Sequence, residues 1–158
     1  MTRARRILIA VAGAACLVVP AADASVAVKG VDTSGFPVVR VSVLTSEPSS
    51  VRGDPERLGR AIANVLGNAL KWSPEGGSVE VRVSRGAVVI RDHGPGIDEA
   101  DLPLVFERFY RAPTARGTPG SGLGLAIVRH VVEAHGGSAE AGNAPGGGAV
   151  LTLRLRTV

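Results

Sequence analysis

Apolar positions recur at helical spacing in one long stretch near the middle of the chain. Between residues 54 and 72, apolar side chains return every three or four positions, as in a helix with one buried face. Asp54, Pro55 and Glu56 supply a cap, a first-turn proline and an early acid for its start, and SPEGG at 73–77 ends it. The expected buried face comprises Leu58, Ile62, Val65, Leu66, Ala69 and Leu70.

Short stretches in which apolar and polar residues alternate predict the strands of a sheet. SVEVRVS at 78–84 and AVVIRD at 87–92 predict a hairpin that turns at Arg85 and Gly86. Valines at alternate positions within 38–44 predict an earlier strand, and SAEAGN and AVLTLRLR predict a closing strand pair. Strands therefore flank both sides of the predicted helices along the chain.

The polar side of the first helix carries an unusual combination of side chains. At about 100° per residue, Asn64, Asn68 and Lys71 fall within roughly 60° of one another, opposite the apolar face. A solvated helix surface is the ordinary explanation of such a stripe. Two asparagines inside a helix lower its intrinsic propensity without an obvious return, so a bound ligand is the alternative explanation.

Glycines gather at two places where the main chain could approach a ligand. Asp92 directly follows a strand, and Gly94 and Gly96 after it would let a flat ligand approach the backbone while the Asp accepts a hydrogen bond. A plain Asp-Gly turn remains the alternative. The stretch 120–137 begins with three alternate glycines at the start of a second helix, where backbone amides make an anion site. Between them, 101–122 is rich in Pro, Gly and Arg and predicts a mobile flap.

Composition and charge narrow the classes of function. The 158 residues predict one domain, and 45% hydrophobic residues predict a packed core. The net charge of +4 comes from arginines that are scattered and not interleaved with aromatics, so we expect a solvated basic surface and no nucleic-acid partner. The single cysteine, Cys16, excludes a disulfide within the chain and a metal cluster built from cysteines.

The first 24 residues have the pattern of a targeting segment. MTRARR is a basic start, residues 7–19 are an apolar run, and the segment ends on a small-x-small pattern at 22–24. The run is shorter than the roughly 20 residues of a membrane helix, which favours a signal peptide over a membrane anchor. We therefore predict a signal-like or anchoring segment at 1–24, a linker with a possible first strand at 25–50, and the main domain at 51–158.

Four motifs in order carry a resemblance to a known family. NVLGNALKW, RDHGPGI, VFERFYRA and GSGLGLAIV resemble the N box, the first glycine box, the F box and the second glycine box of bacterial sensor histidine kinases, in their actinobacterial form. The resemblance covers roughly residues 51 to 156. It implies the Bergerat fold, an α/β two-layer sandwich in which a mixed, mostly antiparallel sheet packs on helices and a mobile lid covers ATP.

The same resemblance implies a role for each residue of the motifs. Asp92 would accept a hydrogen bond from the adenine amino group, Trp72 would stack on the base, and Asn68 would hold Mg²⁺ between the phosphates. Asn64, Asn68 and Lys71 form the implied catalytic set. Arg111 and Arg116 are further candidates for phosphate contact. The implied ATP-binding set is Asn64, Asn68, Lys71, Trp72, Asp92, Gly94, Gly96, Ile97, Phe106, Phe109, Arg116, Gly120, Gly122, Leu123, Gly124 and Leu125, with Phe106 and Phe109 anchoring the lid.

The kind of phosphoryl transfer depends on Asn64. ATP-hydrolysing relatives and anti-sigma serine kinases carry a general-base Glu at this position, and an amide cannot take a proton from water or a serine hydroxyl. Transfer to an imidazole, which is already nucleophilic, is therefore favoured. No acceptor-histidine motif or long dimerising helix pair is found ahead of residue 54, so we expect a histidine supplied in trans. An inactive ATP-binding remnant of a fused or truncated gene, and an anti-sigma-type serine kinase, remain the alternatives.

The partners implied are ATP, a histidine-containing dimerisation domain and a response regulator of a two-component system. ATP is a cytoplasmic substrate, so the domain is expected to work in the cytoplasm. The apolar run at 7–19 instead indicates export or membrane association, and these two expectations conflict.

Overall fold

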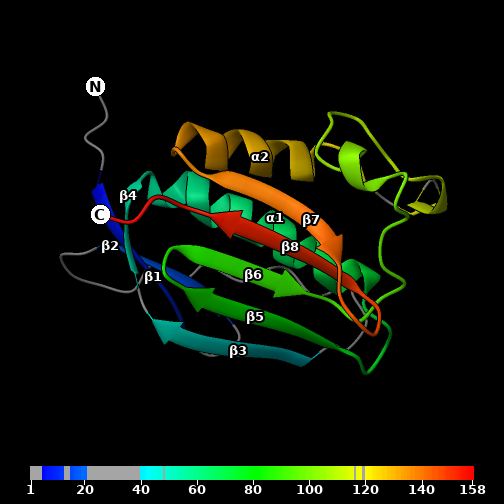
Figure 1. The fold of residues 1–158 in the computed structure, drawn as a ribbon, viewed down its shortest axis with the longest axis horizontal. Helices are drawn as coiled ribbons and strands as arrows, with labels where there is room; N and C mark the ends of the chain where they lie inside the picture. Colours follow the sequence, from blue (N-terminus) through cyan, green and yellow to red (C-terminus); the bar gives the residue numbers. More distant parts are fainter. Residues whose placement is uncertain (1–4, 13–14, 21–39, 48, 116, 119) are drawn as a thin grey trace.

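The core of the protein is a five-stranded sheet covered on one face by two helices (Figure 1). The structure is a computed structural model that describes residues 5–12, 15–20, 40–47, 49–115, 117–118 and 120–158, with side chains from residue 50 onward. Across the sheet the strands lie in the order β3 (Arg40–Glu47), β5 (Ser78–Ser84), β6 (Ala87–Arg91), β8 (Ala149–Arg154) and β7 (Ser138–Asn143). Only β3 runs parallel to its neighbour, so the sheet is mixed and mostly antiparallel as expected.

The long helix forms where the apolar spacing predicts it. α1 (Pro55–Trp72) is capped by Asp54, whose Oδ1 accepts from the backbone N–H groups of Glu56 and Arg57 at 3.0 and 3.2 Å. Ser73 ends it, with its hydroxyl donating to the Ala69 carbonyl at 2.8 Å. All six residues of the predicted apolar face are buried.

The core lies between the helices and the inward side of the sheet. α2 (Gly124–Ala134) packs beside α1, and it lies next to β7 at one end of the sheet, whereas α1 lies behind the middle strands (Figure 1). Alternate strand residues point into this layer, namely Val79, Val81, Val83, Val88, Ile90, Leu151 and Leu153. The two-layer α/β sandwich expected from the sequence is confirmed.

The predicted hairpin and the closing strand pair are confirmed with small differences in length. β5 and β6 turn through Arg85 and Gly86, both with positive φ (47° and 77°), which matches the right-handed twist of the strands. A Cβ at Gly86 would lie 2.5 Å from the Leu155 carbonyl oxygen, so the turn also requires glycine for space. The strand predicted at 38–44 is β3, although residues 38 and 39 lie outside the described residues.

The segment ahead of the domain contributes a second, smaller sheet. β1 (Arg5–Ala12) pairs with β2 (Ala15–Pro20) and with β4 (Ser49–Gly53), all antiparallel. No helix among the described residues is long and apolar enough to cross a bilayer. The predicted small-x-small site at 22–24 and most of the predicted 25–50 linker lie outside the described residues, and the signal segment stays a prediction.

Candidate functional site

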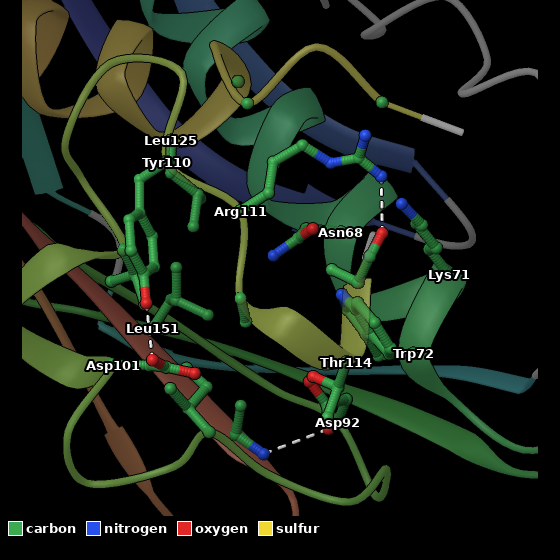
Figure 2. A pocket seen from close by; sticks show the side chains of 18 of the residues that line it. Asn68, Lys71, Trp72, Asp92, Asp101, Tyr110, Arg111, Thr114, Leu125 and Leu151 are labelled. Carbon is green, nitrogen blue, oxygen red and sulfur yellow. Dashed lines mark hydrogen bonds between the residues drawn. The ribbon is translucent and has the colours of Figure 1, made fainter. Parts of the chain in front are cut away.

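A cavity of about 430 Å³ opens between α1, the loop after β6, the N-terminus of α2 and the segment between them. We call residues 98–122, which bridge the first glycine motif and α2, the lid. Figure 2 shows Lys71 and Trp72 on one side of this cavity, Asp101 and Tyr110 of the lid on the other, and Asn68 between them. The site therefore joins segments that are far apart in the sequence.

The polar stripe of α1 forms one wall of the cavity. Asn64, Asn68 and Lys71 all line it. The Asn64 amide donates to the Gly124 carbonyl at 3.4 Å, while the Asn68 side chain makes no hydrogen bond within the described residues. Burial, and then the nearby positive charge of Arg111, lower the pKa of Lys71 below the usual lysine value. The stripe is thus the wall of a cavity and not a solvated surface.

Trp72 extends this wall at the end of the helix. The Lys71 ammonium lies 5.5 Å from the centre of the Trp72 ring, in cation–π range. Trp72 is also the single tryptophan of the chain. Its indole therefore offers a flat apolar surface inside the cavity and an intrinsic fluorescence signal for ligand binding.

Asp92 lies at the floor of the cavity and is 3% exposed. Its Oδ1 accepts from the backbone N–H groups of Gly94 at 2.9 Å and Ala149 at 3.0 Å. Its Oδ2 accepts no hydrogen bond from any residue that the structure describes. One carboxylate oxygen therefore fixes the side chain, and the other is available to a donor on a ligand.

The glycines after Asp92 are required by close contacts within the protein itself. A Cβ at Gly94 would lie 2.3 Å from the Trp72 carbonyl oxygen, so this residue lets the loop pass against the end of α1. Gly96 has φ of 82°, and a Cβ there would lie 2.8 Å from Oδ1 of Asn143. Gly96 and Ile97 line the cavity, whereas Gly94 does not.

The N-terminus of α2 faces the cavity without a side-chain cap. Leu123 occupies the cap position and supplies no side-chain acceptor. Gly120, Gly122 and Gly124 line the cavity, and Gly120 approaches Lys71 so closely that a Cβ would lie 3.5 Å from its ammonium. Uncapped amides, the helix dipole and a lysine are together suited to an anion.

The lid is held by a small number of contacts. The backbone N–H of Phe109 donates to the Gly122 carbonyl at 3.0 Å, and the Tyr110 hydroxyl donates to Asp101 Oδ1. Arg111 donates to the carbonyls of Ala115 and Thr118 within the lid. Two short 3-10 turns, η1 (Leu102–Leu104) and η2 (Pro113–Ala115), are the regular elements in its described part.

The two predicted lid anchors differ in the structure. Phe106 packs against the hydrophobic core, whereas Phe109 is 71% exposed and has a positive φ of 63°. The anchoring contact therefore belongs to Phe106. Sequence reasoning assigned both phenylalanines one role because their aromatic character alone does not tell which faces the core.

Most of the predicted ligand-binding residues meet in the cavity. Those that line it are Asn64, Asn68, Lys71, Trp72, Asp92, Gly96, Ile97, Gly120, Gly122, Gly124 and Leu125. Phe106, Phe109 and Leu123 do not line it, and Arg116 lies outside the described residues. The cavity is also lined by Tyr110, one of the aromatic residues of the predicted flap, and by Asp98, Asp101 and Thr114, which the sequence analysis did not single out. Asp101 and Tyr110 both lie within the predicted flap at 101–122, and their hydrogen bond was not visible from spacing.

The donors around the cavity fit a nucleotide better than a metal ion held by protein alone. Among the described residues no group of three or more His, Cys, Asp or Glu side chains converges on one point. Lys71, Arg111 and the amides of α2 lie toward one end, and the free Asp92 oxygen lies on the floor. An Mg²⁺ ion could take one amide oxygen here only together with phosphate oxygens and water, as this ion usually does.

Comparisons with known proteins show the family of the chain. The profile of the family described as "Histidine kinase-, DNA gyrase B-, and HSP90-like ATPase" matches residues 53–158. The chain is 52% identical over 107 residues to a signal transduction histidine-protein kinase/phosphatase MprB of Mycobacterium sp. (strain KMS), covering 61% of this chain and 21% of that protein. The chain thus spans about a fifth of the length of this curated relative.

Two solved structures show the same arrangement of helices and strands. One is a mycobacterial sensor histidine kinase MprB, with a TM-score of 0.68 and 45% identity over 76% of this chain and 86% of that one. The other is the ATP binding domain of PrrB from Mycobacterium tuberculosis, with a TM-score of 0.59 and 33% identity over 78% of this chain and 83% of that one. Both likenesses extend over most of this chain and most of the other.

Proposed function

Because the chain belongs to the family of histidine kinase-, DNA gyrase B- and HSP90-like ATPases, we propose that residues 51–158 bind ATP with Mg²⁺ and transfer its γ-phosphoryl group to a histidine supplied in trans. Residues 53–158 are homologous to the ATP-binding catalytic domain of sensor histidine kinases. The observation that supports the proposal most is the pairing of a half-free buried carboxylate with an uncapped helix start in one cavity.

Asp92 is the residue proposed to select adenine. Its Oδ2 can accept from the exocyclic amino group of the base, while guanine offers a carbonyl at the same position and would meet the carboxylate with repulsion. Gly96 and Ile97 line the same part of the cavity, and Trp72 supplies a flat surface for the ring. A ligand with an amino-bearing aromatic base is therefore the one that satisfies this end.

The other end is proposed to hold the phosphates. The start of α2 has no side-chain cap and lines the cavity through Gly124 and Leu125, so its backbone amides can serve an anion there, and Lys71 contributes a positive charge from α1. Mg²⁺, when bound, would neutralise phosphate charge during transfer. Asn68 is the residue proposed to hold it. Asn64 keeps Gly124 in place through its 3.4 Å hydrogen bond and offers no proton acceptor of carboxylate strength.

The absence of a carboxylate at residue 64 favours histidine as the acceptor. A neutral imidazole needs no base to remove a proton before it attacks, whereas water and serine do. The proposed partners are therefore a dimerisation domain that carries the acceptor histidine and a response regulator that receives the phosphoryl group. The proposed place of action is the cytoplasm, where ATP is supplied.

Calorimetry tests the metal-dependent part of this proposal. The full chain should bind ADP more tightly with Mg²⁺ than without it, and Asn68→Ala should abolish most of that difference while leaving metal-free binding nearly unchanged. Glu99→Gln, an exposed carboxylate close to the cavity but not lining it, is the matched control. Equal affinity of the wild type in the two conditions would remove Asn68 as a metal ligand. Failure to bind ADP in either condition would reject the function.

A further inference from the structure

We propose that Asn143 positions residues 92–97, the loop that meets the base, by pairing with both backbone polar groups of Ile97. The inference rests on the proposed function and adds to it a residue of β7 that does not line the cavity. We call residues 92–97 the base loop. Asn143 is a positioning residue in this scheme, because it acts on the ligand through Ile97 and not by contact.

The contact between Asn143 and Ile97 is bidentate. The Ile97 N–H donates to Asn143 Oδ1 at 2.8 Å, and Asn143 Nδ2 donates to the Ile97 carbonyl at 2.7 Å. The two residues are 46 positions apart in the chain. A carboxamide carries an N–H donor and a C=O acceptor side by side. It can therefore hydrogen-bond to the backbone N–H and the backbone carbonyl of one residue at once, as a neighbouring strand does. Among the common side chains only Asn and Gln share this pattern.

The other end of the base loop is held by the same hairpin. Asp92 and Ala149 exchange hydrogen bonds, with the Asp92 N–H donating to the Ala149 carbonyl and the Ala149 N–H donating to Asp92 Oδ1, both at 3.0 Å. Gly148 passes so close that a Cβ there would lie 1.9 Å from the Asp92 carbonyl oxygen. The tip of the β7–β8 hairpin therefore fastens the first residue of the loop through Ala149 and the last through Asn143.

Between these two attachments the loop has no strand partner of its own. Gly96 takes a φ of 82° and lies directly against the Asn143 amide, where a Cβ would be 2.8 Å from Oδ1. Loss of the amide would free a segment whose glycines already permit many conformations. Gly96 and Ile97 line the cavity, so a bound nucleotide would have to order the freed loop again. The conformational entropy lost in this step would weaken the affinity for the base.

The effect should be confined to recognition of the base. Asn143 lies on β7, whereas Asn68 and Lys71 belong to α1 and the amides proposed for the phosphates belong to α2. A general loss of stability would weaken every nucleotide alike. Loss of loop positioning should instead weaken a nucleotide that uses Asp92 more than one that does not.

The experiment compares ADP with IDP, whose base carries a carbonyl in place of the adenine amino group and a hydrogen on the adjacent ring nitrogen N1, with the same ribose and phosphates. Affinities of the full chain are measured for the wild type, Asn143→Ala and Asn143→Asp. The carboxylate introduced by Asn143→Asp is isosteric with the amide and can still accept from Ile97, but it cannot donate to the Ile97 carbonyl. Each lost net hydrogen bond corresponds to about threefold to tenfold in affinity, so both variants should bind ADP weaker by that range, with Asn143→Ala at its upper end.

The ratio of ADP to IDP affinity is the deciding readout. This ratio should fall in both Asn143 variants and stay unchanged in Glu140→Gln. Glu140 lies on β7, as Asn143 does, and makes an exposed ion pair with Arg154 of β8 (3.7 Å). Exchange of the Ile97 amide hydrogen in the free protein should become faster in Asn143→Ala, which removes its acceptor, and stay unchanged in Glu140→Gln. An unchanged ratio, with ADP and IDP affinities that fall together or not at all, overturns the inference. A wild type that binds neither nucleotide overturns the proposed function, and a wild type that binds both equally overturns base recognition by Asp92.

Discussion

The two oxygens of Asp92 have different surroundings, and the proposed preference for adenine depends on this difference. Oδ1 is held by two backbone N–H groups, and Oδ2 has no hydrogen-bond partner among the described residues, in a side chain that lines the cavity. The carboxylate is therefore fixed before any ligand arrives, so a base that matches it loses little conformational freedom on binding.

Asp92→Ala should weaken ADP binding by about tenfold or more, because a hydrogen bond to a charged acceptor contributes roughly 1.5 to 3 kcal/mol. The variant also leaves the N–H groups of Gly94 and Ala149 without their acceptor, so a melting curve must accompany the titration. Asp92→Asn is the matched variant, since it keeps the shape and can still accept from those groups. We expect it to lose ADP affinity with little loss of stability, whereas GDP bound as tightly as ADP by the wild type would contradict the role of Asp92.

The lowered pKa of Lys71 predicts a pH dependence of nucleotide binding. Burial, and secondarily Arg111, disfavour the ammonium in the free protein. Phosphate favours the ammonium, so the pKa should be higher in the complex than in the free protein. Affinity is then complete below the free-state pKa and is lost as the pH rises from that value toward the pKa of the complex.

ADP titrations between about pH 7 and about pH 10 test this dependence, which should begin at a lower pH than for an ordinary lysine. Lys71→Arg is the control, because a guanidinium stays protonated across this range and its profile should be flat. Identical profiles for the two proteins would assign the pH dependence to another group.

Among the secondary-structure elements, the contrast lies between a rigid sandwich and a loosely held lid. α1, α2 and the strands bury continuous apolar faces, whereas Phe109 and Leu104 of the lid remain 71% and 41% exposed. The lid is joined to its surroundings by Phe106, which packs against the core, and by an ion pair of Glu107 with Arg129 of α2 (3.5 Å). The Tyr110–Asp101 and Phe109–Gly122 hydrogen bonds lie within the lid itself. Segments with so few buried contacts open at low free-energy cost.

Trypsin should therefore cut the free protein first in the lid, after Arg108 or Arg111. ADP with Mg²⁺ should slow these cuts, because contacts of the lid with a bound nucleotide favour its closed form. Arg57 in α1 and Arg129 in α2 serve as internal controls, since cleavage there requires a helix to open. Lid cleavage at the same rate with and without nucleotide would mean that the lid does not respond to the ligand.

For the whole molecule, the positions of the described histidines bear on the proposed phosphoryl transfer. His135 accepts from the Asp54 N–H at 3.0 Å and donates to the Val131 carbonyl at 2.6 Å, and so joins the end of α2 to the start of α1. His93 pairs with Glu80 at 3.1 Å on the open face of the sheet, and His130 lies on the exposed side of α2. None of these three lines the cavity.

The purified chain should therefore bind γ-labelled ATP without labelling itself and without brisk hydrolysis. Mixed with a dimerisation fragment of a related kinase that carries its acceptor histidine, it should label that histidine slowly, because the two parts meet by diffusion and not through a tether. The fragment with its histidine changed to alanine is the control. Acid-stable labelling would support a serine or threonine acceptor, and no transfer despite confirmed binding would support the inactive remnant.

Much of the fold and most of the cavity follow from local sequence. The spacing of apolar residues in α1 also sets the opposite stripe, so burial of Leu58 to Leu70 necessarily turns Asn64, Asn68 and Lys71 to one side. Glycines after a strand and before a helix mark Asp92 and the start of α2 for the same local reason. Four ordered motifs then identify the family, since chance would not place all of them at workable separations.

The neighbours that each of these residues meets depend on the folded chain. Gly94 is needed because the loop crosses the end of α1, Phe106 and not Phe109 reaches the core, and Asn143 meets Ile97 from 46 residues away. Such contacts arise where the sheet brings distant segments together. The periodicity of apolar residues along the chain does not predict which residues 46 positions apart will meet. Local spacing was enough to predict α1, α2 and the strands of the five-stranded sheet, and the ordered motifs were enough to indicate the family, whereas β1, β2 and β4 were not expected. The packing of β7 and β8 against the base loop, and of the lid against α2, required the three-dimensional arrangement of the whole chain.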